Sequence, residues 1–433
     1  MAFREIGYRA LVHAARPLLH AAAPLNDKLG RGVAGWSGSL DRLRLWSKAH
    51  RSDQPLVWVH APSVGESLMA QAIVSELRRA RPNLQIAFTH FSASAERGRE
   101  RVAADVSDYL PWDTTRTMSA ALDLLRPAAI AFVRTEIWPG LTRMAVQRRI
   151  PLLLVNAVLA TGSSRLGPLA RFALRPAYQR LDFVGAINDE TAARFSRLGV
   201  PPARIRVTGD ARFDQVWARL RHLQPDQPLL HRLRGDGIKT VVAGSTWPAD
   251  EAHLLPAVAR VAANQRVRLI LAPHEPDAKH LEQAARASAA AGLSHALLAK
   301  VEHNAGPLPT VIIVDRVGVL ADLYALADIA FVGGAFQGSG VHSVVEPAAF
   351  GVPVLMGPGH QNAEEAGQLL QSGGAIEVAG TAALAHALRT WLGNESLRRE
   401  AAVAARTLVT RRLGGAAANA ALITEVMDRA VTN

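Results

Sequence analysis

Short apolar strands alternate with helical patterns along most of this chain. In the first half, runs of four to six residues rich in Val, Ile, Leu and Phe are separated by segments with helical spacing. Strands that are apolar throughout, with helices between them, indicate a parallel sheet covered by helices on both faces. The predicted strands of this half are 56–60, 84–89, 129–133, 151–156, 183–187 and 205–208.

The same alternation restarts after a polar segment, 217–228, that ends in two prolines and predicts a linker. The sequence therefore predicts an α/β protein with two doubly wound, Rossmann-like domains, whose ligands bind in the crevice beyond the carboxyl ends of the strands. The second set of strands is predicted at 240–243, 267–272, 310–314, 329–332 and 353–356. The predicted divisions are an N-terminal segment 1–50, a first domain 51–216, the linker, a second domain 229–410 and a C-terminal helix 411–433.

Composition narrows the class of function. The 433 residues include no cysteine, which excludes disulfides, zinc–thiolate sites and thiol nucleophiles. The formal net charge of +12 favours anionic partners, but aromatic residues make up only 5% and do not interleave with a basic stripe, so we expect no nucleic-acid partner. No uninterrupted apolar run is long enough to span a membrane, and no signal peptide is evident.

Residues 2–20 have the pattern of an amphipathic helix. Glu5, Arg9, His13, Arg16 and His20 share one face, and apolar side chains occupy the rest of the wheel. Such a helix suits an anionic membrane surface, but it could equally dock on the protein's own core. The local excess of basic residues within 1–50 slightly favours the membrane.

The stretch 57–67 predicts a strand, a tight loop at Ser63 and Gly65, and a helix start that carries Glu66. A carboxylate beside the free N–H groups of a helix start, just beyond a strand end, is well placed to act as a general base. The alternative is structural, because Glu66 could be the capping-box partner of Ser63.

Two later strand ends of the first half also present polar residues. Thr135 and Glu136 follow the strand 129–133, and Asn156 ends the next strand. Glu136 could orient a substrate or pair with Arg134 as part of the scaffold, and we favour a supporting role.

In the second half, a glycine-rich loop (333–340) follows a strand and leads to a predicted helix start at Ser343, with Glu346 placed to accept both hydroxyls of a ribose. Gly244, Ser245 and Thr246 form a small-residue turn suited to phosphate, and Pro273 and His274 follow another strand. No Asp-x-Asp pair, zincin motif or P-loop is present, and no G-x-G-x-x-G follows the first strand, so we expect no metal and no dinucleotide. The pattern indicates a sugar-nucleotide site.

At these residues the chain resembles the 3-deoxy-D-manno-octulosonic acid (Kdo) transferases of lipopolysaccharide synthesis. The resemblance covers almost the whole chain and rests on 60–66, 135–139, 208–214, 244–246, 272–274 and 333–347. It implies a GT-B fold and metal-independent, inverting transfer of Kdo from CMP-Kdo to a lipid A precursor, without a cofactor, at the cytoplasmic face of the inner membrane. It also implies a membrane-associated N-terminus.

The resemblance implies that Glu66 is the general base. Ser63, Gly65, Thr135, Glu136 and Asn156, which lie at strand ends and loops of the same half, are predicted on the acceptor side or as its support. The resemblance implies that CMP is held by Pro273, His274, Val317, Gly318, Val319, Ser343, Val344, Val345 and Glu346, and we add the turn of Gly244, Ser245 and Thr246.

Three positions depart from the family's pattern. His274 stands alone where some members have Arg-His, Ser343 replaces an asparagine after His342, and Val319 replaces the acid of a Met-Gly-Glu turn. Two other functions stay open: a GT-B enzyme, either transferase or epimerase, for another nucleotide sugar, and a non-catalytic sugar-nucleotide sensor.

Overall fold

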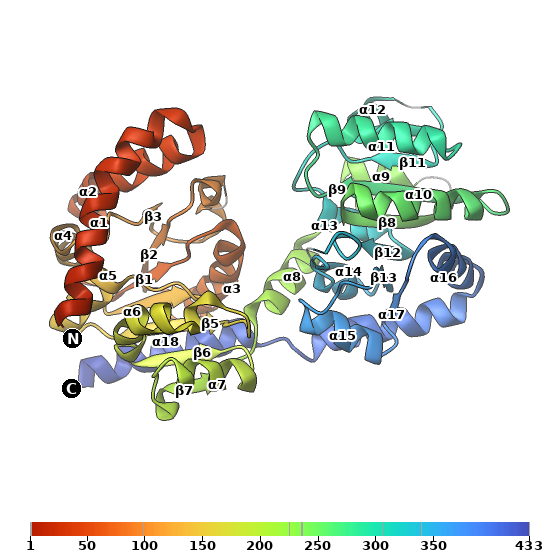
Figure 1. Cartoon of the computed structure of the whole chain (residues 1–433). Helices are drawn as coiled ribbons and strands as arrows, with labels where there is room; N and C mark the ends of the chain where they lie inside the picture. Colours follow the sequence, from red (N-terminus) through yellow and green to blue (C-terminus); the bar gives the residue numbers. More distant parts are fainter. Residues whose placement is uncertain are drawn as a thin grey trace. The chain divides into compact units, whose positions relative to one another are not determined.

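The computed structural model contains two compact α/β units (Figure 1). The first unit comprises Met1–Gln215 and Arg412–Asn433, and the second comprises Val216–Arg411. The structure describes residues 2–432 apart from Gly98, Pro225, Gly235, Asp236, Ala305 and Ser339. Ser339 of the glycine-rich loop therefore lies outside the described residues.

The first unit is built on a seven-stranded parallel sheet, in the order β3-β2-β1-β4-β5-β6-β7. Because β1 pairs with both β2 and β4, the strand order reverses beside β1, where His60 and Val133 end neighbouring strands. The strands are β1 (Leu56–His60), β2 (Gln85–His90), β3 (Val106–Tyr109), β4 (Ala129–Val133), β5 (Leu152–Ala157), β6 (Phe183–Ala186) and β7 (Ile205–Val207).

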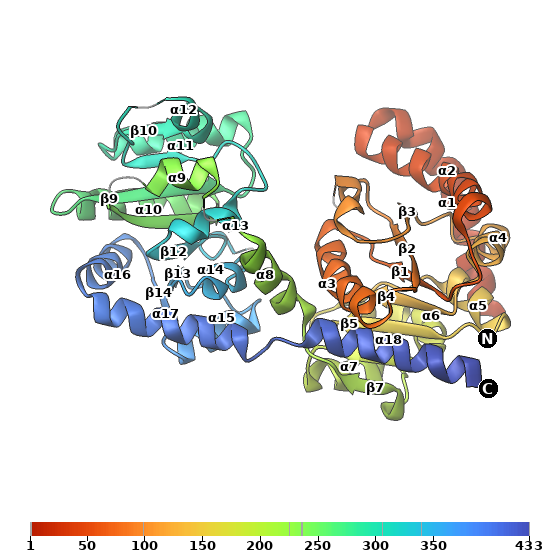
Figure 2. The same cartoon turned by 180° about the vertical axis from the view of Figure 1, so that it is seen from behind.

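Helices cover both faces of this sheet, because successive strand residues point to opposite sides and both sides are apolar. Trp58 packs in one core cluster, and Val57 and Val59 pack in the other. The C-terminal helix α18 returns to this unit and packs against α3 (Figure 2). The helices are α3 (Val64–Ala80), α4 (Thr115–Leu125), α5 (Pro139–Gln147), α6 (Pro168–Gln179), α7 (Asp189–Arg197) and α18 (Gly415–Thr432). Helix α8 (Ala211–His222) begins in this unit and ends in the second.

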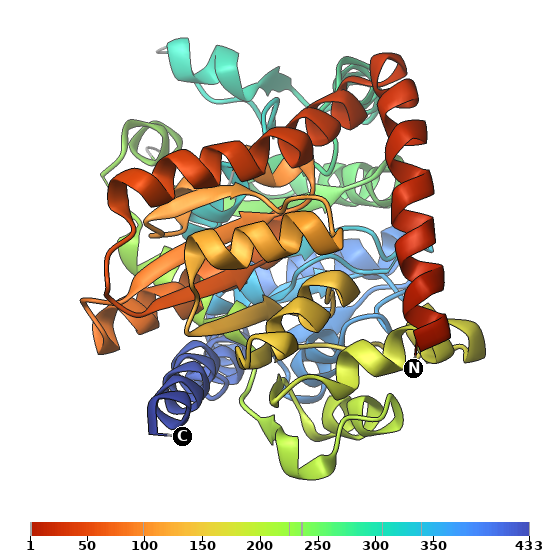
Figure 3. The same ribbon diagram turned by 90° about the vertical axis from the view of Figure 1, so that its left-hand side faces the viewer.

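The N-terminal residues form two helices, α1 (Ala2–Ala22) and α2 (Asp27–His50), drawn in red in Figure 3, where they run in clearly different directions. The predicted helix at 2–20 is confirmed. The Tyr8 hydroxyl donates to Asp113 Oδ2 (2.8 Å), and this buried carboxylate also accepts the first N–H groups of α5, so α1 is joined to the helix that follows β4. Among the described helices, none combines the length and the apolar composition that crossing a membrane requires.

The second unit contains another seven-stranded parallel sheet, ordered β10-β11-β9-β8-β12-β13-β14, with its switch point beside β8. Its strands are β8 (Lys239–Thr246), β9 (Val267–Pro273), β10 (His295–Leu297), β11 (Val311–Ile313), β12 (Ile329–Val332), β13 (Val354–Met356) and β14 (Ala375–Glu377). Its helices are α9 (Pro228–Arg234), α10 (Pro248–Ala262), α11 (Ala278–Ala290), α12 (Leu298–His303), α13 (Leu320–Leu323), α14 (Val345–Ala349), α15 (Glu364–Gln371), α16 (Thr381–Gly393) and α17 (Glu395–Thr410).

The segment predicted as a linker, 217–228, begins within a helix. Helix α8 continues through it to His222, and α9 begins at Pro228. The Arg406 guanidinium lies over the Trp217 ring, 5.2 Å from its centroid, which gives this part of α8 a packing partner.

Candidate active site

Glu66 lies in the first turn of α3, just beyond the carboxyl end of β1. Its side chain is 19% exposed, and its Oε2 accepts a hydrogen bond from the Ser63 hydroxyl. Ser63 is the N-cap residue, yet its side chain makes no capping hydrogen bond with the helix backbone. The capping-box interpretation of this pair is therefore wrong, since the hydroxyl faces the carboxylate instead.

Glu136 follows β4 and lies close enough to Glu66 for the two charges to interact. Burial raises the pKa of Glu136, the nearby Arg165 partly opposes this, and repulsion from Glu66 adds to it. Arg134 does not pair with Glu136, as one interpretation of the sequence had it. Its Nε lies 3.7 Å from Glu66 Oε1.

A buried hydrogen bond joins the two loops that carry these carboxylates. Trp138 Nε1 donates to His60 Nε2 (2.9 Å), and His60 Nδ1 lies 3.0 Å from Thr89 Oγ1. Burial and the neighbouring His90 lower the pKa of His60 to about 3, so the imidazole is neutral at pH 7. His60 and Trp138 therefore fix the Glu66 loop against the Glu136 loop.

Thr135 and Asn156 hold the scaffold at this edge of the sheet. Thr135 Oγ1 donates to the Val158 carbonyl (2.6 Å). Asn156 is fully buried, and its Oδ1 accepts from Ala211 N (2.7 Å) while its own N–H donates to Asn419 Oδ1 on α18 (2.9 Å). These two side chains hydrogen-bond to other protein groups, and in that way they stabilise this edge of the first sheet.

In the second unit, the glycine-rich loop after β12 is held by Asp250 of α10. This buried carboxylate accepts the N–H groups of Gly334 (2.8 Å) and Phe336 (3.3 Å). Gly334 has φ +97, and a Cβ there would meet the Gly340 carbonyl oxygen at 2.3 Å. Only glycine fits at this position, because two segments of the loop pass close to each other.

The turn after β8 is shaped by buried partners on neighbouring segments. A Cβ on Gly244 would lie 2.1 Å from the Tyr324 hydroxyl, and Ser245 has φ +54. Thr246 Oγ1 donates to Glu251 Oε1 (2.8 Å), which also contacts His280 Nε2 (3.0 Å). The three predicted residues therefore offer mainly backbone to a ligand, as a phosphate turn would.

His274 brings an aromatic surface to the same edge. Its ring stacks on His342, with centroids 4.2 Å apart and planes 16° from parallel. Trp247 Nε1 donates to His342 Nε2 (3.1 Å). Burial and the neighbouring His274 lower the pKa of His342. The flat stack of the two rings can lie against a planar base.

Glu346 lies at the start of the short helix α14, near the turn Val317–Gly318–Val319. Arg219 connects the two features, because its Nη2 donates to the Gly318 carbonyl (3.0 Å) and its charge acts on the Glu346 carboxylate. Burial raises the pKa of Glu346, and Arg219 opposes that rise. No local pattern in the sequence indicated Arg219, since it comes from α8.

The residues between Ser343 and Glu346 differ in what they can offer. Ser343 is exposed, whereas Val344 and Val345 are buried in the core, at 0% and 2% exposure. Any contact between these two valines and a ligand is therefore limited to their backbone groups.

Comparison with known proteins identifies the family. Residues 38–215 match the family model of 3-deoxy-D-manno-octulosonic-acid transferase (kdotransferase). The chain is 31% identical over 333 residues to the 3-deoxy-D-manno-octulosonic acid transferase of Bordetella pertussis, covering 73% of this chain and 75% of that protein. It is 28% identical over 362 residues to the corresponding transferase of Haemophilus influenzae, covering 79% and 80%.

The chain belongs to the Kdo transferase family. Solved structures support the fold: the UDP-GlcNAc 2-epimerase from Neisseria meningitidis bound to UDP-GlcNAc aligns with a TM-score of 0.61 at 12% identity, covering 87% of this chain and all of that one. A glycosyltransferase from Rickettsia africae aligns with a TM-score of 0.57 at 11% identity, covering 88% and 100%. The GT-B class expected from the sequence is confirmed.

In this family member, the residues predicted on the acceptor side lie beyond the carboxyl ends of the strands of the first sheet. The residues predicted for the nucleotide lie beyond the carboxyl ends of the strands of the second sheet. Sequence reasoning missed Arg165, Asn419, Asp250, Arg219 and Tyr324, which reach these edges from distant segments. Within the described residues, no cluster of three or more His, Asp or Glu could hold a metal ion.

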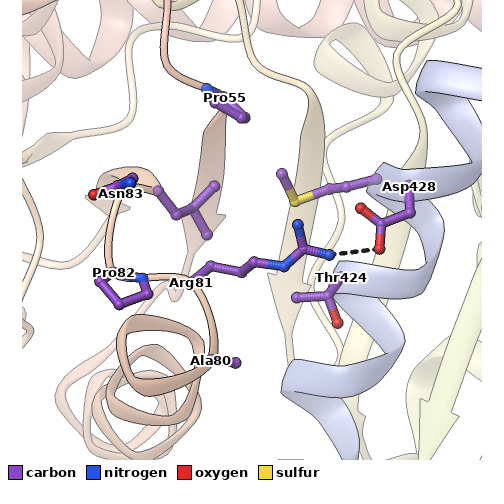
Figure 4. A pocket seen from close by; sticks show the side chains of 9 residues that line it. Pro55, Ala80, Arg81, Pro82, Asn83, Thr424 and Asp428 are labelled. Atoms are coloured by element: carbon purple, nitrogen blue, oxygen red, sulfur yellow. Dashed lines mark hydrogen bonds and ion pairs between the residues drawn. The ribbon is translucent and has the colours of Figure 1, made fainter.

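A pocket of about 240 Å³ lies away from both groups of predicted residues (Figure 4). It is at the opposite edge of the first sheet, next to the start of β2 and the end of α18. Leu84 and Met427 line it, with an ion pair between Arg81 and Asp428 (2.5 Å) at one side. It contains none of the residues that the sequence predicted for the site.

Proposed function

We propose that this protein transfers Kdo from CMP-Kdo to a lipid A precursor in lipopolysaccharide synthesis. The observation that carries the proposal is the position of Glu66. It is a partly exposed carboxylate at the switch point of the first sheet, in a chain of the Kdo transferase family. It lies in the first turn of α3, and Arg134 Nε lies 3.7 Å from its Oε1.

The proposed reaction is a single displacement that inverts the anomeric carbon. Glu66 takes the proton of an acceptor hydroxyl, that oxygen forms a bond to the anomeric carbon of Kdo, and the bond from this carbon to the CMP phosphate breaks. General-base assistance of this kind typically contributes ~10²–10⁴-fold. Glu136, whose pKa burial raises, supports the acceptor beside the base.

The donor nucleotide is assigned to the second unit. The His274–His342 stack would lie against the base, and Glu346 would accept the ribose hydroxyls. Asp250 already occupies the N–H groups of Gly334 and Phe336, so we assign the departing phosphate to the backbone N–H groups at 343–345 instead. No step of this proposal requires a metal or a cofactor.

The direct test is to incubate the purified protein with CMP-Kdo and a tetra-acylated lipid A precursor, and to determine the mass of the product. We expect the acceptor mass to increase by one or more Kdo residues, with release of CMP. Release of CMP without any change in the acceptor would contradict the proposed acceptor.

The second candidate is an enzyme acting on another nucleotide sugar, because UDP-GlcNAc 2-epimerases share the fold. A ligand that binds the folded state raises the melting temperature. We expect CMP to do so more strongly than UMP or UDP, and the reverse order would favour the second candidate. A sensor would bind CMP-Kdo without turning it over.

We further propose that the protein lies on the cytoplasmic face of the inner membrane through α1. Leu11, Leu18 and Leu25 are 64%, 70% and 87% exposed, and Arg9 and Arg16 are exposed on the same helix as Leu11 and Leu18. Exposed leucines flanked by arginines suit the boundary between acyl chains and anionic headgroups.

A further inference from the structure

We propose that Arg134 binds the carboxylate of the sugar that is transferred, beside Glu66. The inference rests on the proposed function and adds to it a subsite for an acidic sugar. Three features of Arg134 support it: its backbone conformation, the small number of contacts that its guanidinium makes, and its distance from the predicted base.

The backbone at Arg134 is one that arginine rarely adopts. Its φ is +80, in the region that glycine occupies freely. Arg126 also has a positive φ, but it ends helix α4, where a left-handed residue is common. Arg134 instead follows β4 directly, and its N–H donates to the Val155 carbonyl (3.0 Å). A strained residue at a strand end in a candidate site points to a need for its side chain.

The guanidinium of Arg134 has donors to spare. Its contacts within the described part of the chain are a weak hydrogen bond to Met69 Sδ (3.9 Å) and an ion pair with Glu66 Oε1 at 3.7 Å, beyond hydrogen-bonding distance. The side chain is 35% exposed. Because guanidinium carries five N–H donors in a planar fork, it can still take a carboxylate in two parallel hydrogen bonds.

The chemistry of the proposed donor places a carboxylate close to this fork. In a 2-ulosonic acid such as Kdo, the anomeric carbon carries the carboxylate. The acceptor oxygen must come within about 3.2 Å of the base and about 3–3.5 Å of the anomeric carbon. A carboxylate one bond from that carbon would therefore lie within reach of a guanidinium that adjoins Glu66.

The test compares the wild-type protein with Arg134→Gln in steady-state transfer assays. We expect the KM for CMP-Kdo to rise about 10- to 100-fold, as loss of a charged hydrogen-bonding partner predicts. The KM for the lipid acceptor and the inhibition constant of CMP should not change, because neither carries this carboxylate. An unchanged KM for CMP-Kdo would overturn the proposal, as would a rise confined to the acceptor, which would instead indicate binding of an acceptor phosphate.

The pH profile separates binding of the sugar from an effect on the base. If Arg134 served only to keep Glu66 ionised, Arg134→Gln would shift the acidic limb of the pH–rate profile upward without changing the KM for CMP-Kdo. That result would overturn the proposal. Failure of the wild-type protein to transfer Kdo would overturn the proposed function itself, and so is distinguishable from either outcome.

Arg134→Gly tests whether the strained backbone is kept for the side chain. Glycine adopts φ +80 freely, so we expect a melting temperature at or above that of the wild type, together with the same rise in KM for CMP-Kdo. Arg149→Gly is a matched control, because Arg149 is exposed, has φ +56 and follows α5 outside the site. We expect it to leave transfer unchanged. A destabilised Arg134→Gly protein with normal KM values would assign Arg134 a structural role.

Discussion

At the scale of single residues, the glycine-rich loop depends on positions where any side chain would collide. At Gly334 both the conformation and the space require glycine, because φ is +97 and the Gly340 carbonyl lies where a Cβ would be. Asp250 accepts a hydrogen bond from the Gly334 N–H, which anchors the start of the loop.

We predict that Gly334→Ala lowers the free energy of unfolding. The left-handed conformation costs alanine about 1–2 kcal/mol, and the collision of its Cβ with the Gly340 carbonyl lowers the stability further. Urea denaturation measures this, and CMP should raise the melting temperature less than in the wild type. Gly367→Ala is the control, because Gly367 lies within α15 with open space around it, and helix propensity predicts a small gain in stability.

The buried His60 predicts a pH dependence of stability. Its pKa is about 3 in the folded protein and about 6.5 when unfolded, so the unfolded state binds more protons between these values. The contribution of the neutral His60 to the free energy of unfolding is complete above about pH 6.5. This contribution is lost at up to about 1.4 kcal/mol per pH unit as the pH falls towards 3.

His60→Gln should remove the titrating imidazole and still provide a side-chain acceptor for the Trp138 N–H. We expect the stability difference between wild type and variant to shrink as the pH falls from 6.5 to 4, measured by urea denaturation. A difference independent of pH would show that His60 titrates normally.

Residue roles could be predicted from sequence only where the relevant neighbours are close in the chain. Glu66 stands next to Ser63 and a helix start, so its exposure at a strand end was predictable. Arg165 and Asn419 reach the same edge from far along the chain, and no local pattern reveals such a partner. One of two interpretations paired Arg134 with Glu136, whereas its Nε faces Glu66, because sequence distance does not fix side-chain direction.

At the scale of elements, the central strands were predicted and three edge strands were not. The missed strands, β3, β10 and β14, lie at sheet edges. An edge strand is covered less completely than a central one, so it needs no continuous apolar run: Ser107 and Asp108 occupy β3, and Glu377 ends β14. Burial on both faces made the central strands readable. The fourth edge strand, β7, was predicted although Arg206 and Val207 are exposed.

The C-terminal helix α18 is an integral part of the first unit, and Asn419 joins it to the candidate site. Asn419 Oδ1 accepts from the Asn156 N–H (2.9 Å) and the Thr208 hydroxyl (3.1 Å). We predict that Asn419→Ala lowers the free energy of unfolding by about 1–3 kcal/mol, because the buried Asn156 N–H loses its acceptor.

Thermal and urea unfolding of Asn419→Ala measure this effect. Ala417→Ser, on the exposed side of α18, is the control and should stay within about 0.5 kcal/mol of the wild type. Equal stability of Asn419→Ala and Ala417→Ser would contradict a supporting role for α18 at this edge.

At the scale of the whole molecule, the net charge of +12 and the exposed leucines of α1 lead to one expectation about membranes. We predict that Leu11→Ser/Leu18→Ser weakens binding to vesicles containing anionic lipid by about tenfold, because apolar contact with the acyl region is lost. Binding of the wild type should also weaken at high salt, which screens Arg9 and Arg16.

Vesicle sedimentation tests this prediction, with Val207→Ser as a control for an exposed apolar residue on β7. The control should bind as the wild type does. Wild-type protein that stays in the supernatant with anionic vesicles would contradict the membrane proposal without bearing on catalysis.

The central claim is that the carboxylate at the end of β1 removes the acceptor's proton. The most direct measurement is the rate of Kdo transfer by Glu66→Gln beside the wild type, with both proteins at saturating CMP-Kdo and acceptor. The account predicts a rate at least about 100-fold lower, with an unchanged melting temperature and an unchanged response to CMP. Transfer at near the wild-type rate by a folded Glu66→Gln protein would contradict it.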